Sequence, residues 1–349
     1  MNVRNGATLA ALVVLILTWG SKPPTLVLVI VGVLLGTSVL SAVHFAEVVA
    51  HRVGEPFGSL VLAVAVTVIE VGLIVTLMVS DGHGNETLAR DTVFAAAMIT
   101  CNGILGLAVL IGALRRHTAT FNAEGTASAL ATVSTLAVLT LVLPAFTTSH
   151  PGPEFTSAQL AFAGVASVAL YGLFVFVQTV RHRDYFVVDH EEHAVPPSDR
   201  EAVISLGMLV IALVAVVGLA KVESQAIEDV VTGLGAPKSA VGVVIALLVL
   251  GPETLAAVRN ANRDRVQTSL NLALGSAMAS IGLTIPAIAV ASIWLEGPLV
   301  LGLDSTQIVL LVITMIVGAL TVLPGRATVQ EGGVHLVLFA AFVFLALNP

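Results

Sequence analysis

The chain has 349 residues, of which 57% are hydrophobic and 11% are charged, and its mean hydropathy is +1.01. A soluble domain carries charge on about a quarter of its residues, so this composition excludes a soluble globular fold and predicts an all-α polytopic membrane protein. The formal net charge of −7 does not point to a nucleic-acid partner, because most charges lie in short segments between apolar runs. The lipid bilayer is the expected surrounding, and the single Cys101 excludes a disulfide framework.

Apolar runs of about 20 residues, long enough to cross a bilayer core as helices, recur along the whole chain. The first run is short for a span and leads into Ser21-Lys22-Pro23-Pro24 without a small-residue cleavage site, so no cleaved signal is expected. The second and seventh runs are long, which predicts tilted or projecting helices. We predict eleven spans, at residues 6–20, 24–50, 57–80, 91–113, 126–146, 157–180, 201–222, 237–258, 267–293, 305–323 and 332–347.

The basic residues sort onto two sides of the membrane if successive loops alternate. One side collects Arg4, Arg52, Arg115, Arg116, Arg181, Arg183, Arg200, Arg259, Arg263, Arg265 and Arg326. The other side collects Lys22, Arg90, Lys221 and Lys238. Short cytoplasmic loops are enriched in Lys and Arg, so the first side is predicted to be cytoplasmic, with the amino terminus inside and the carboxyl terminus outside. The bias toward arginine, alanine and valine favours a bacterial inner (cell) membrane.

Two stretches of the chain resemble each other. FAEVVAHRVGEP, residues 45–56, matches AIEDVVTGLGAP, residues 226–237, when Glu47 is placed on Glu228. The following span then carries one glutamate in each copy, Glu70 and Glu253, with two residues of slip. The next span begins NGILGLA in the first copy and NLALGSA in the second, which places Asn102 on Asn271.

These matches predict a duplicated chain. The predicted organisation is a leading transmembrane helix at 1–22, a first repeat at 23–180, an acidic cytoplasmic linker at 181–200 and a second repeat at 201–349. Each repeat holds five spans, an odd number, so the two copies must have opposite orientations in the membrane. Inverted repeats with a binding site near the midplane are a recurring plan among transporters.

Glu70 and Glu253 are the candidate ion-binding residues. Each lies about 13 to 16 residues into its span, roughly 20 Å along a helix and therefore near the middle of the bilayer. An ionised acid there costs a few kcal/mol, and no Lys or Arg lies inside a predicted span. The acids must be compensated by protons, by a bound cation or by water. A pair of protonated structural acids is the alternative.

A pair of acids predicts obligatory exchange. Either one Ca²⁺ or two protons would bring the pair close to neutrality, whereas the empty charged pair would resist crossing between inward and outward states. Ca²⁺ takes six to eight oxygen ligands, so further ligands are needed. Candidates are backbone carbonyls near Gly251, freed because Pro252 lacks an N–H, the amides of Asn102 and Asn271, and the hydroxyl of Ser276. Hydrogen bonding between helices is the alternative role for the asparagines.

Further acids and histidines lie at the ends of two spans. Glu47 and Glu228 are either gate or proton-relay acids or ordinary interfacial acids. His44 and His51 lie three residues before and four residues after Glu47, on the same helix face, so a relay through all three is one interpretation and solvated interfacial histidines are the other. In the linker, Asp189, Glu191 and Glu192 either recruit cations or belong to a solvated connection.

The stretches GEPFG…TVIE and GAPKSAVGVVIALLVLGPE followed by NLALGSAMASIGLTIP resemble the bacterial calcium/proton antiporters of the cation/calcium exchanger superfamily. The resemblance extends from about residue 24 to the end. It implies ten core helices, a calcium site around Glu70 and Glu253, proton-coupled calcium export by alternating access, and a gate or relay role for Glu47 and, less directly, Glu228.

One departure from the family concerns selectivity. The vacuolar branch has Gly-Asn three and four residues before each central glutamate, where this chain has Val66-Thr67 and Val249-Leu250. Cation selectivity therefore does not transfer on these residues, and some relatives move Na⁺ or K⁺. A monovalent cation/H⁺ antiporter on the same scaffold is the alternative function, and a passive cation channel is a third.

An enzyme is not expected, because the chain has neither a His-Glu-x-x-His motif nor a Gly-x-Ser-x-Gly nucleophile. The expected ligands are transported Ca²⁺ (or Na⁺ or K⁺) and H⁺, with no tightly bound cofactor, and a homo-oligomer is compatible with the sequence.

Overall fold

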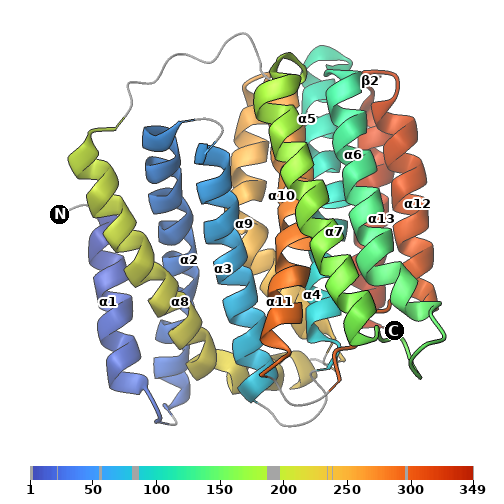
Figure 1. Cartoon of the computed structure of the whole chain (residues 1–349). Coiled ribbons are helices and arrows are strands. Elements are labelled where there is room, and N and C mark those ends of the chain that lie inside the picture. The colour runs from blue at the N-terminus through green and yellow to red at the C-terminus, as the bar shows by residue number, and fades with distance from the viewer. Residues whose placement is uncertain are drawn as a thin grey trace. The chain divides into compact units, whose positions relative to one another are not determined.

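The computed structural model describes residues 3–21, 23–54, 57–80, 86–186, 197–233, 235–237, 239–294 and 298–348. These residues are almost entirely helical (Figure 1). Ten helical segments in the described part of the chain are long and apolar enough to cross a membrane, and a shorter apolar helix precedes them. Every predicted span has a helix, so the all-α polytopic fold class is confirmed.

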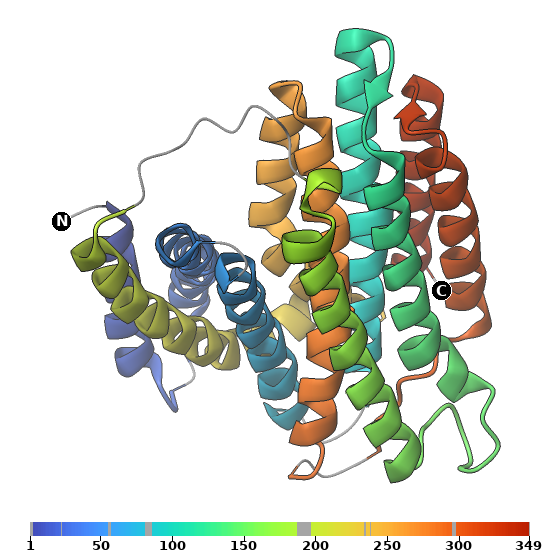
Figure 2. The ribbon, with the colours of Figure 1, turned by 45° about the horizontal axis from the view of Figure 1, so that its top comes forward.

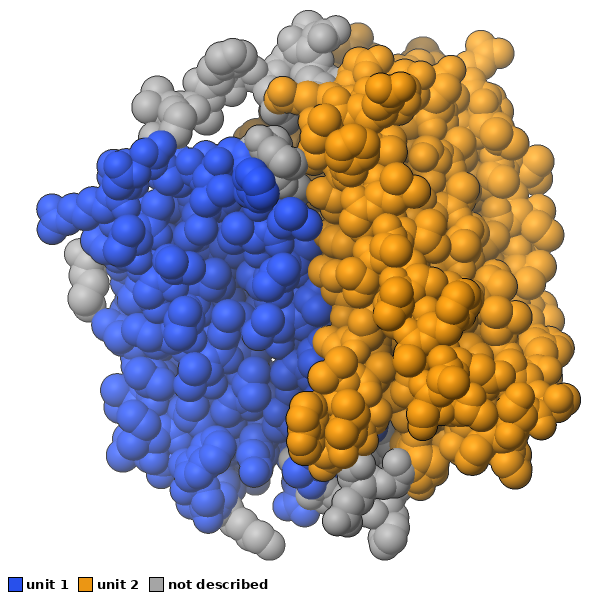
Figure 3. Space-filling model, viewed as in Figure 1, with its two compact units in different colours: residues 1–85, 192–241 blue, residues 86–191, 242–349 orange. Residues whose placement is uncertain are grey.

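The chain divides into two compact units (Figure 3). Unit 1 comprises residues 1–85 and 192–241, and unit 2 comprises residues 86–191 and 242–349. The division differs from the two predicted sequence repeats, because each unit draws residues from both halves of the chain. The two units are defined by contacts in space and not by similarity of sequence. The predicted duplication of the sequence therefore remains a separate prediction.

Unit 1 is a bundle of four helices in which α8 packs against the other three. Its helices are α1 (Val3–Thr18), α2 (Thr25–Val53), α3 (Phe57–Ser80) and α8 (Asp199–Gly233). Small residues allow this close packing: a Cβ on Gly72 of α3 would lie 2.5 Å from Cγ2 of Val217 on α8, and a Cβ on Gly218 of α8 would overlap Leu15 of α1.

The contact between α2 and α8 extends along much of both helices (Figures 1 and 2). Arg52, at the end of α2, donates from Nε to Oδ1 of Asp199, the first residue of α8, at 2.7 Å. At the other end of the contact, Gly32 of α2 lies against Glu223 of α8. The two helices are therefore antiparallel neighbours.

Unit 2 contains the remaining spans. They are α4 (Leu88–Met98) continuing into α5 (Leu105–Arg116), α6 (Ala123–Ala137), α7 (Ser157–Phe176), α9 (Ala240–Asn262, from Gly242 onward), α10 (Val266–Ala279) continuing into α11 (Ile285–Ala291), α12 (Ser305–Val322) and α13 (Val329–Leu347). The strands β1 (Ala119–Thr120) and β2 (Arg326–Ala327) pair antiparallel, with Ala119 opposite Ala327.

Four described spans of unit 2 contain a π-helical turn: Val138–Val142 and Val177–Arg181 follow the ends of α6 and α7, and in two other spans the turn lies between two α-helices. Residues Ile99–Ile104 join α4 to α5, and residues Ser280–Thr284 join α10 to α11. A π-helical turn inserts a residue into the regular α-helical ladder and is frequent at functional sites. Both of these joining turns are buried apart from Leu283.

The boundaries of several helices differ from the predicted spans. The leading helix α1 has 16 residues, and α8 runs to Gly233, well past the predicted end at residue 222. Lys221, predicted to lie at the end of that span, is thus inside a 35-residue helix. Helix α4 begins at Leu88, so Arg90 lies in its first turn and not in a loop.

Asp264, between α9 and α10, carries a pH-dependent contact in unit 2. Its carboxylate accepts hydrogen bonds from Nη2 of Arg116 at 3.1 Å and from Nε of Arg115 at 3.2 Å. The hydrogen bond from Arg116, followed by that from Arg115, lowers the pKa of Asp264 below its ordinary value of 3.8. A lowered pKa in the folded state stabilises the protein above the ordinary pKa, and the contribution disappears as pH falls through the folded value.

We therefore expect Asp264→Asn to lower the thermal midpoint at neutral pH. Asparagine tolerates the left-handed backbone of this position, where φ is 60°, so the change isolates the charge. The difference in midpoint between variant and wild type should shrink as pH falls below 3.8, the ordinary pKa of this group. Thermal unfolding of detergent-solubilised protein over a pH series measures this difference in midpoint. A difference that grows at low pH would contradict a stabilising role for the ionised Asp264 carboxylate.

Candidate functional site

Glu70 lies in the middle of α3 and is buried. Only 3% of its surface is exposed, and its helix neighbours Ile69, Leu73 and Ile74 are almost completely buried. The residue lies 13 positions after Phe57, the first residue of α3. The sequence thus places a carboxyl group in a densely packed apolar part of the protein, as expected.

Glu253 has the same position within its own helix. It lies 13 positions after Ala240, the first residue of α9, and 9% of its surface is exposed. The two residues of slip in the sequence match therefore disappear when the positions are measured from the starts of the helices. Pro252, directly before Glu253, lies inside α9, where its missing N–H leaves the carbonyl of Leu248 without its helical donor.

Asn102 belongs to a buried polar cluster in unit 2. It lies in the π-helical turn between α4 and α5 and is completely buried. Its Nδ2 donates to Oγ1 of Thr314 at 2.9 Å, and its Oδ1 lies 3.0 Å from Nδ1 of His335. The other ring nitrogen of His335 lies 3.1 Å from Oγ1 of Thr321. These contacts connect the turn to α12 and α13.

The cluster also fixes the tautomer of His335. An amide oxygen can only accept a hydrogen bond, so Nδ1 of His335 carries a proton. Both ends of the Asn102 amide are occupied by protein groups, which is the alternative role that the sequence left open for this residue. As a cation ligand, Asn102 would share its Oδ1, which has two lone pairs, between the cation and Nδ1 of His335.

The hydroxyl of Thr314 is a testable part of this cluster. We expect Thr314→Val to lower the free energy of unfolding by about 1–3 kcal/mol, because a buried amide N–H₂ would lose its hydroxyl acceptor. Thr135→Val is the matched control, since Thr135 is exposed on α6 and its hydroxyl donates only within its own helix, to Ala131. Equal unfolding curves for the two variants would show that the contact contributes nothing.

Asn271 does not occupy the position that corresponds to Asn102. It lies 5 residues after the start of α10, whereas Asn102 lies 14 residues after the start of α4. Its Oδ1 accepts from Nε2 of Gln267 at 2.8 Å, and its Nδ2 donates to the carbonyl of Phe186 at 2.7 Å. Asn271 therefore attaches α10 to the segment that follows α7.

Matching the two asparagines does not align the features that correspond in the structure. These are the π-helical turns, which lie midway along the spans formed by α4 with α5 and by α10 with α11. A run containing glycine and buried threonine or serine marks each turn: Thr100 and Gly103 in the first, and Ser280, Gly282 and Thr284 in the second. The hydroxyl groups of these residues are oxygen atoms in the π-helical turns, in addition to the candidate ligands predicted from the sequence. Among the other predicted ligands, Ser276 is half-buried in α10 and Gly251 is exposed on α9.

The predicted relay residues are only partly brought together. Nδ1 of His44 lies 3.7 Å from Oε2 of Glu47, and both side chains are partly exposed at the end of α2. His51 is exposed one turn further along, and Glu228 is half-buried in α8. Asp189, Glu191 and Glu192 lie outside the described residues. Within the described part of the chain, no group of three or more His, Cys, Asp or Glu side chains could hold a metal ion.

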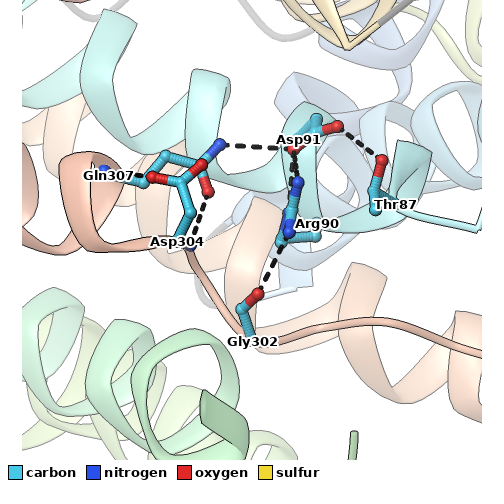
Figure 4. Close-up of polar contacts among 6 residues, drawn as sticks. All are labelled: Thr87, Arg90, Asp91, Gly302, Asp304 and Gln307. Atoms are coloured by element: carbon cyan, nitrogen blue, oxygen red, sulfur yellow. Dashed lines mark hydrogen bonds and ion pairs between the residues drawn. The ribbon is translucent and has the colours of Figure 1, made fainter. Parts of the chain in front are cut away.

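A buried ion pair in unit 2 was not predicted from the sequence. Arg90 Nη2 and Asp91 Oδ1 are 2.9 Å apart, and the Asp91 side chain is 3% exposed (Figure 4). Thr87 donates to the other carboxylate oxygen at 2.8 Å, and Gln307, in the first turn of α12, donates to Oδ1 at 3.3 Å. Arg90 also donates to the carbonyl of Gly302 at 3.2 Å. The cluster joins the beginning of α4 to the segment before α12.

Apolar helices long enough to span a bilayer, together with buried glutamates in the middle of two of them, are the features of a multi-span membrane transporter for cations. The chain belongs to the sodium/calcium exchanger protein family, whose model matches residues 23–180 and 204–348. The resemblance to cation/calcium exchangers is therefore confirmed, and the family is one of exchangers.

Individual relatives agree with this assignment. The protein y4hA of Sinorhizobium fredii, which carries the name of an ionic transporter, is 46% identical over 93% of this chain and 89% of its own. The sodium-potassium/proton antiporter ChaA of Escherichia coli is 34% identical over 95% of this chain and 93% of its own. The crystal structure of the H⁺/Ca²⁺ exchanger CAX superposes with a TM-score of 0.72 over 99% of this chain and 91% of that one, at 16% identity.

Proposed function

We propose that this protein is a proton-coupled cation antiporter in which Glu70 and Glu253 bind either the transported cation or protons. The observation that carries the proposal is the equivalent placement of the two buried acids, each 13 residues into an apolar helix. An unrelated pair of structural acids has no reason to share this position.

The coupling follows from the charge on the carboxyl groups. Two carboxylates in a medium of low dielectric are costly when empty, because each ionised group loses its hydration. One Ca²⁺, or two protons, compensates the two charges. The protein can then change between its inward- and outward-facing states with either the cation or the protons bound, but not with the site empty. Cation movement therefore depends on counter-movement of protons. The physiological direction that we propose is export of the cation, driven by entry of protons.

Ca²⁺ is the cation that we propose first, because it compensates two carboxylates by itself and accepts the flexible oxygen coordination that carbonyls and hydroxyls provide. Na⁺ or K⁺, bound together with one retained proton, satisfies the same charge sum. The similarity to a sodium-potassium/proton antiporter over nearly the whole chain favours this second candidate. Candidate further ligands are carbonyls near Gly251 and the hydroxyl of Ser276.

The proposed organisation keeps the leading helix, two inverted repeats and a cytoplasmic linker. The two separate matches to the family model, at residues 23–180 and 204–348, support a duplicated chain. We propose that the arginine-rich side faces the cytoplasm, with the amino terminus inside a bacterial cell membrane. The contact between His44 and Glu47 supports a gate or relay at that end of α2, to which Glu228 would correspond in α8.

Reconstitution into liposomes with an imposed pH gradient tests the function. We expect a proton gradient to drive cation accumulation, and a comparison of Ca²⁺, Na⁺ and K⁺ under the same gradient to identify the substrate. Currents that persist without a counter-ion would indicate a channel and contradict the proposal. Accumulation of Na⁺ or K⁺ but not Ca²⁺ would select the second candidate.

A further inference from the structure

Glu223, on α8 in unit 1, is a buried acid with no role in the site described so far. Only 7% of its surface is exposed. Its Oε1 has no hydrogen-bond partner among the described residues. From the sequence it resembles an ordinary acid just beyond a predicted span, and only the extension of α8 to Gly233 places it inside a helix.

Gly32 of α2 provides the space for this carboxyl group. A Cβ added to Gly32 would lie 3.6 Å from Oε1 of Glu223, which is ordinary van der Waals contact. The carboxyl group thus packs directly onto the backbone of α2. Lys221 is two positions away on α8, and its Nζ lies 5.4 Å from the centroid of the Trp19 ring, so it faces another side of the helix.

Within the described residues of unit 1, the elements packed against α8 supply no counter-charge at this level. Their charged or titratable residues, within the described part of unit 1, are Arg4 on α1, His44, Glu47, His51 and Arg52 on α2, and Glu70 on α3. His44 is the nearest of those on α2 to Gly32, and the 12 residues between them correspond to about 18 Å of helix. Arg52 pairs with Asp199, at the far end of the α2–α8 contact.

A carboxylate buried in this way, without a counter-charge, is strongly disfavoured relative to water, whereas a protonated carboxyl group does not carry that penalty. We propose that Glu223 is a proton-binding site which takes up protons at the membrane side opposite the amino terminus and supplies them to Glu70. This inference rests on the proposed antiport function, because it assigns the entry of the coupling proton.

The position of Glu223 along the bundle supports this route. Trp19 and Lys221 are residue types that anchor helices at a membrane–water interface, and Glu223 lies one turn or less from Lys221. Val217 of α8 contacts Gly72 of α3, and Gly72 is two residues from Glu70. On α8, Glu223 lies six residues beyond Val217, about 9 Å further along the helix. Glu223 is therefore closer to the interface than Glu70 within the same unit.

A proton would cross the remaining distance through water. Oγ of Ser38 on α2 is a further buried oxygen atom of unit 1 that has no hydrogen-bond partner among the described residues, and such an atom binds internal water. Ser38 lies six residues beyond Gly32 on α2, the same distance along the bundle as Val217 lies from Glu223 on α8. In each cycle a water-borne proton forms an O–H bond with the Glu223 carboxylate. That bond breaks as a proton is delivered to the Glu70 carboxylate, and Glu223 returns to its ionised form before the next proton binds.

Glu223→Gln removes proton binding and keeps the size of the side chain. In right-side-out vesicles at saturating cation, we expect transport at limiting outer proton concentration to fall roughly 100-fold, the low end of what a positioned proton-transfer group contributes. The cation concentration for half-maximal transport should stay unchanged. Asp229→Asn, an exposed acid on the same helix, is the matched control. A pH profile for Glu223→Gln that superposes on that of the wild type would overturn the proposal.

A second measurement does not depend on transport. Infrared difference spectra of the purified protein between low and high pH report the C=O stretch of protonated carboxyl groups. We expect one buried carboxyl band to be missing in Glu223→Gln and present in Asp229→Asn. An unchanged band overturns the proton site even if antiport is confirmed. A missing band in a protein that does not exchange cations would leave the proton site in place and reject the proposed function instead.

Discussion

Replacing Glu70 with glutamine is expected to reduce gradient-driven cation transport by roughly 100-fold or more, and Glu253→Gln is expected to do the same. Glutamine keeps the shape and the burial of the side chain but removes one negative charge. With a divalent cation bound, the site would then carry an uncompensated positive charge, which costs several kcal/mol in a dry interior. Each 1.4 kcal/mol corresponds to a factor of ten.

The measurement is cation uptake into liposomes under an imposed pH gradient, with protein amount and folding matched by size-exclusion chromatography. Glu124→Gln is the control, because Glu124 is an exposed acid in the first turn of α6. Normal exchange in either Glu70→Gln or Glu253→Gln would remove that acid from the mechanism. If both variants retained exchange, the buried acids would be structural, and the alternative stated from the sequence would hold.

Arg90→Ala is expected to lower the free energy of unfolding by about 3 kcal/mol or more, because removal of one partner leaves a buried charge uncompensated. The side chains of Arg90 and Asp91 are 12% and 3% exposed, so solvent cannot replace the lost guanidinium. Thr87 and Gln307 would still donate to Asp91, which limits the loss. The contact from Arg90 to the carbonyl of Gly302 would also disappear.

Unfolding in mixed detergent and denaturant, followed by circular dichroism, measures this loss. Arg326→Ala provides the comparison, since Arg326 is an exposed arginine in β2. The double variant Arg90→Met/Asp91→Leu tests the physical reason, because removing both charges should restore much of the stability that the single change loses. A double variant as unstable as Arg90→Ala would show that packing, and not the unpaired charge, accounts for the effect.

The spans and the two buried acids could be predicted from the sequence because both depend on local pattern. A run of 20 apolar residues forms a helix in lipid whatever surrounds it, and a lone acid such as Glu70 inside that run has few ways to be compensated. The helices that contain Glu70 and Glu253 accordingly lie where hydropathy predicts them.

The remaining polar interior could not be predicted, because it depends on contacts between distant segments. The amide of Asn102 meets His335 across 233 positions of sequence, and a single apolar helix gives no sign of either partner. The buried state of Glu223 depends on Gly32 of another helix. The equivalence of Asn102 with Asn271 failed for a related reason, since the motif letters agreed while the positions along the helices did not.

The central claim is that cations and protons compete for the same two carboxyl groups, and counting protons tests it most directly. Calorimetric titration of purified protein with Ca²⁺, repeated with Na⁺, in buffers of different ionisation enthalpy measures the protons released for each cation bound. We predict that the wild type releases protons near neutral pH, and that Glu70→Gln and Glu253→Gln each release fewer or lose binding. Cation binding that releases no protons in the wild type, or equal numbers in all three proteins, would contradict the account.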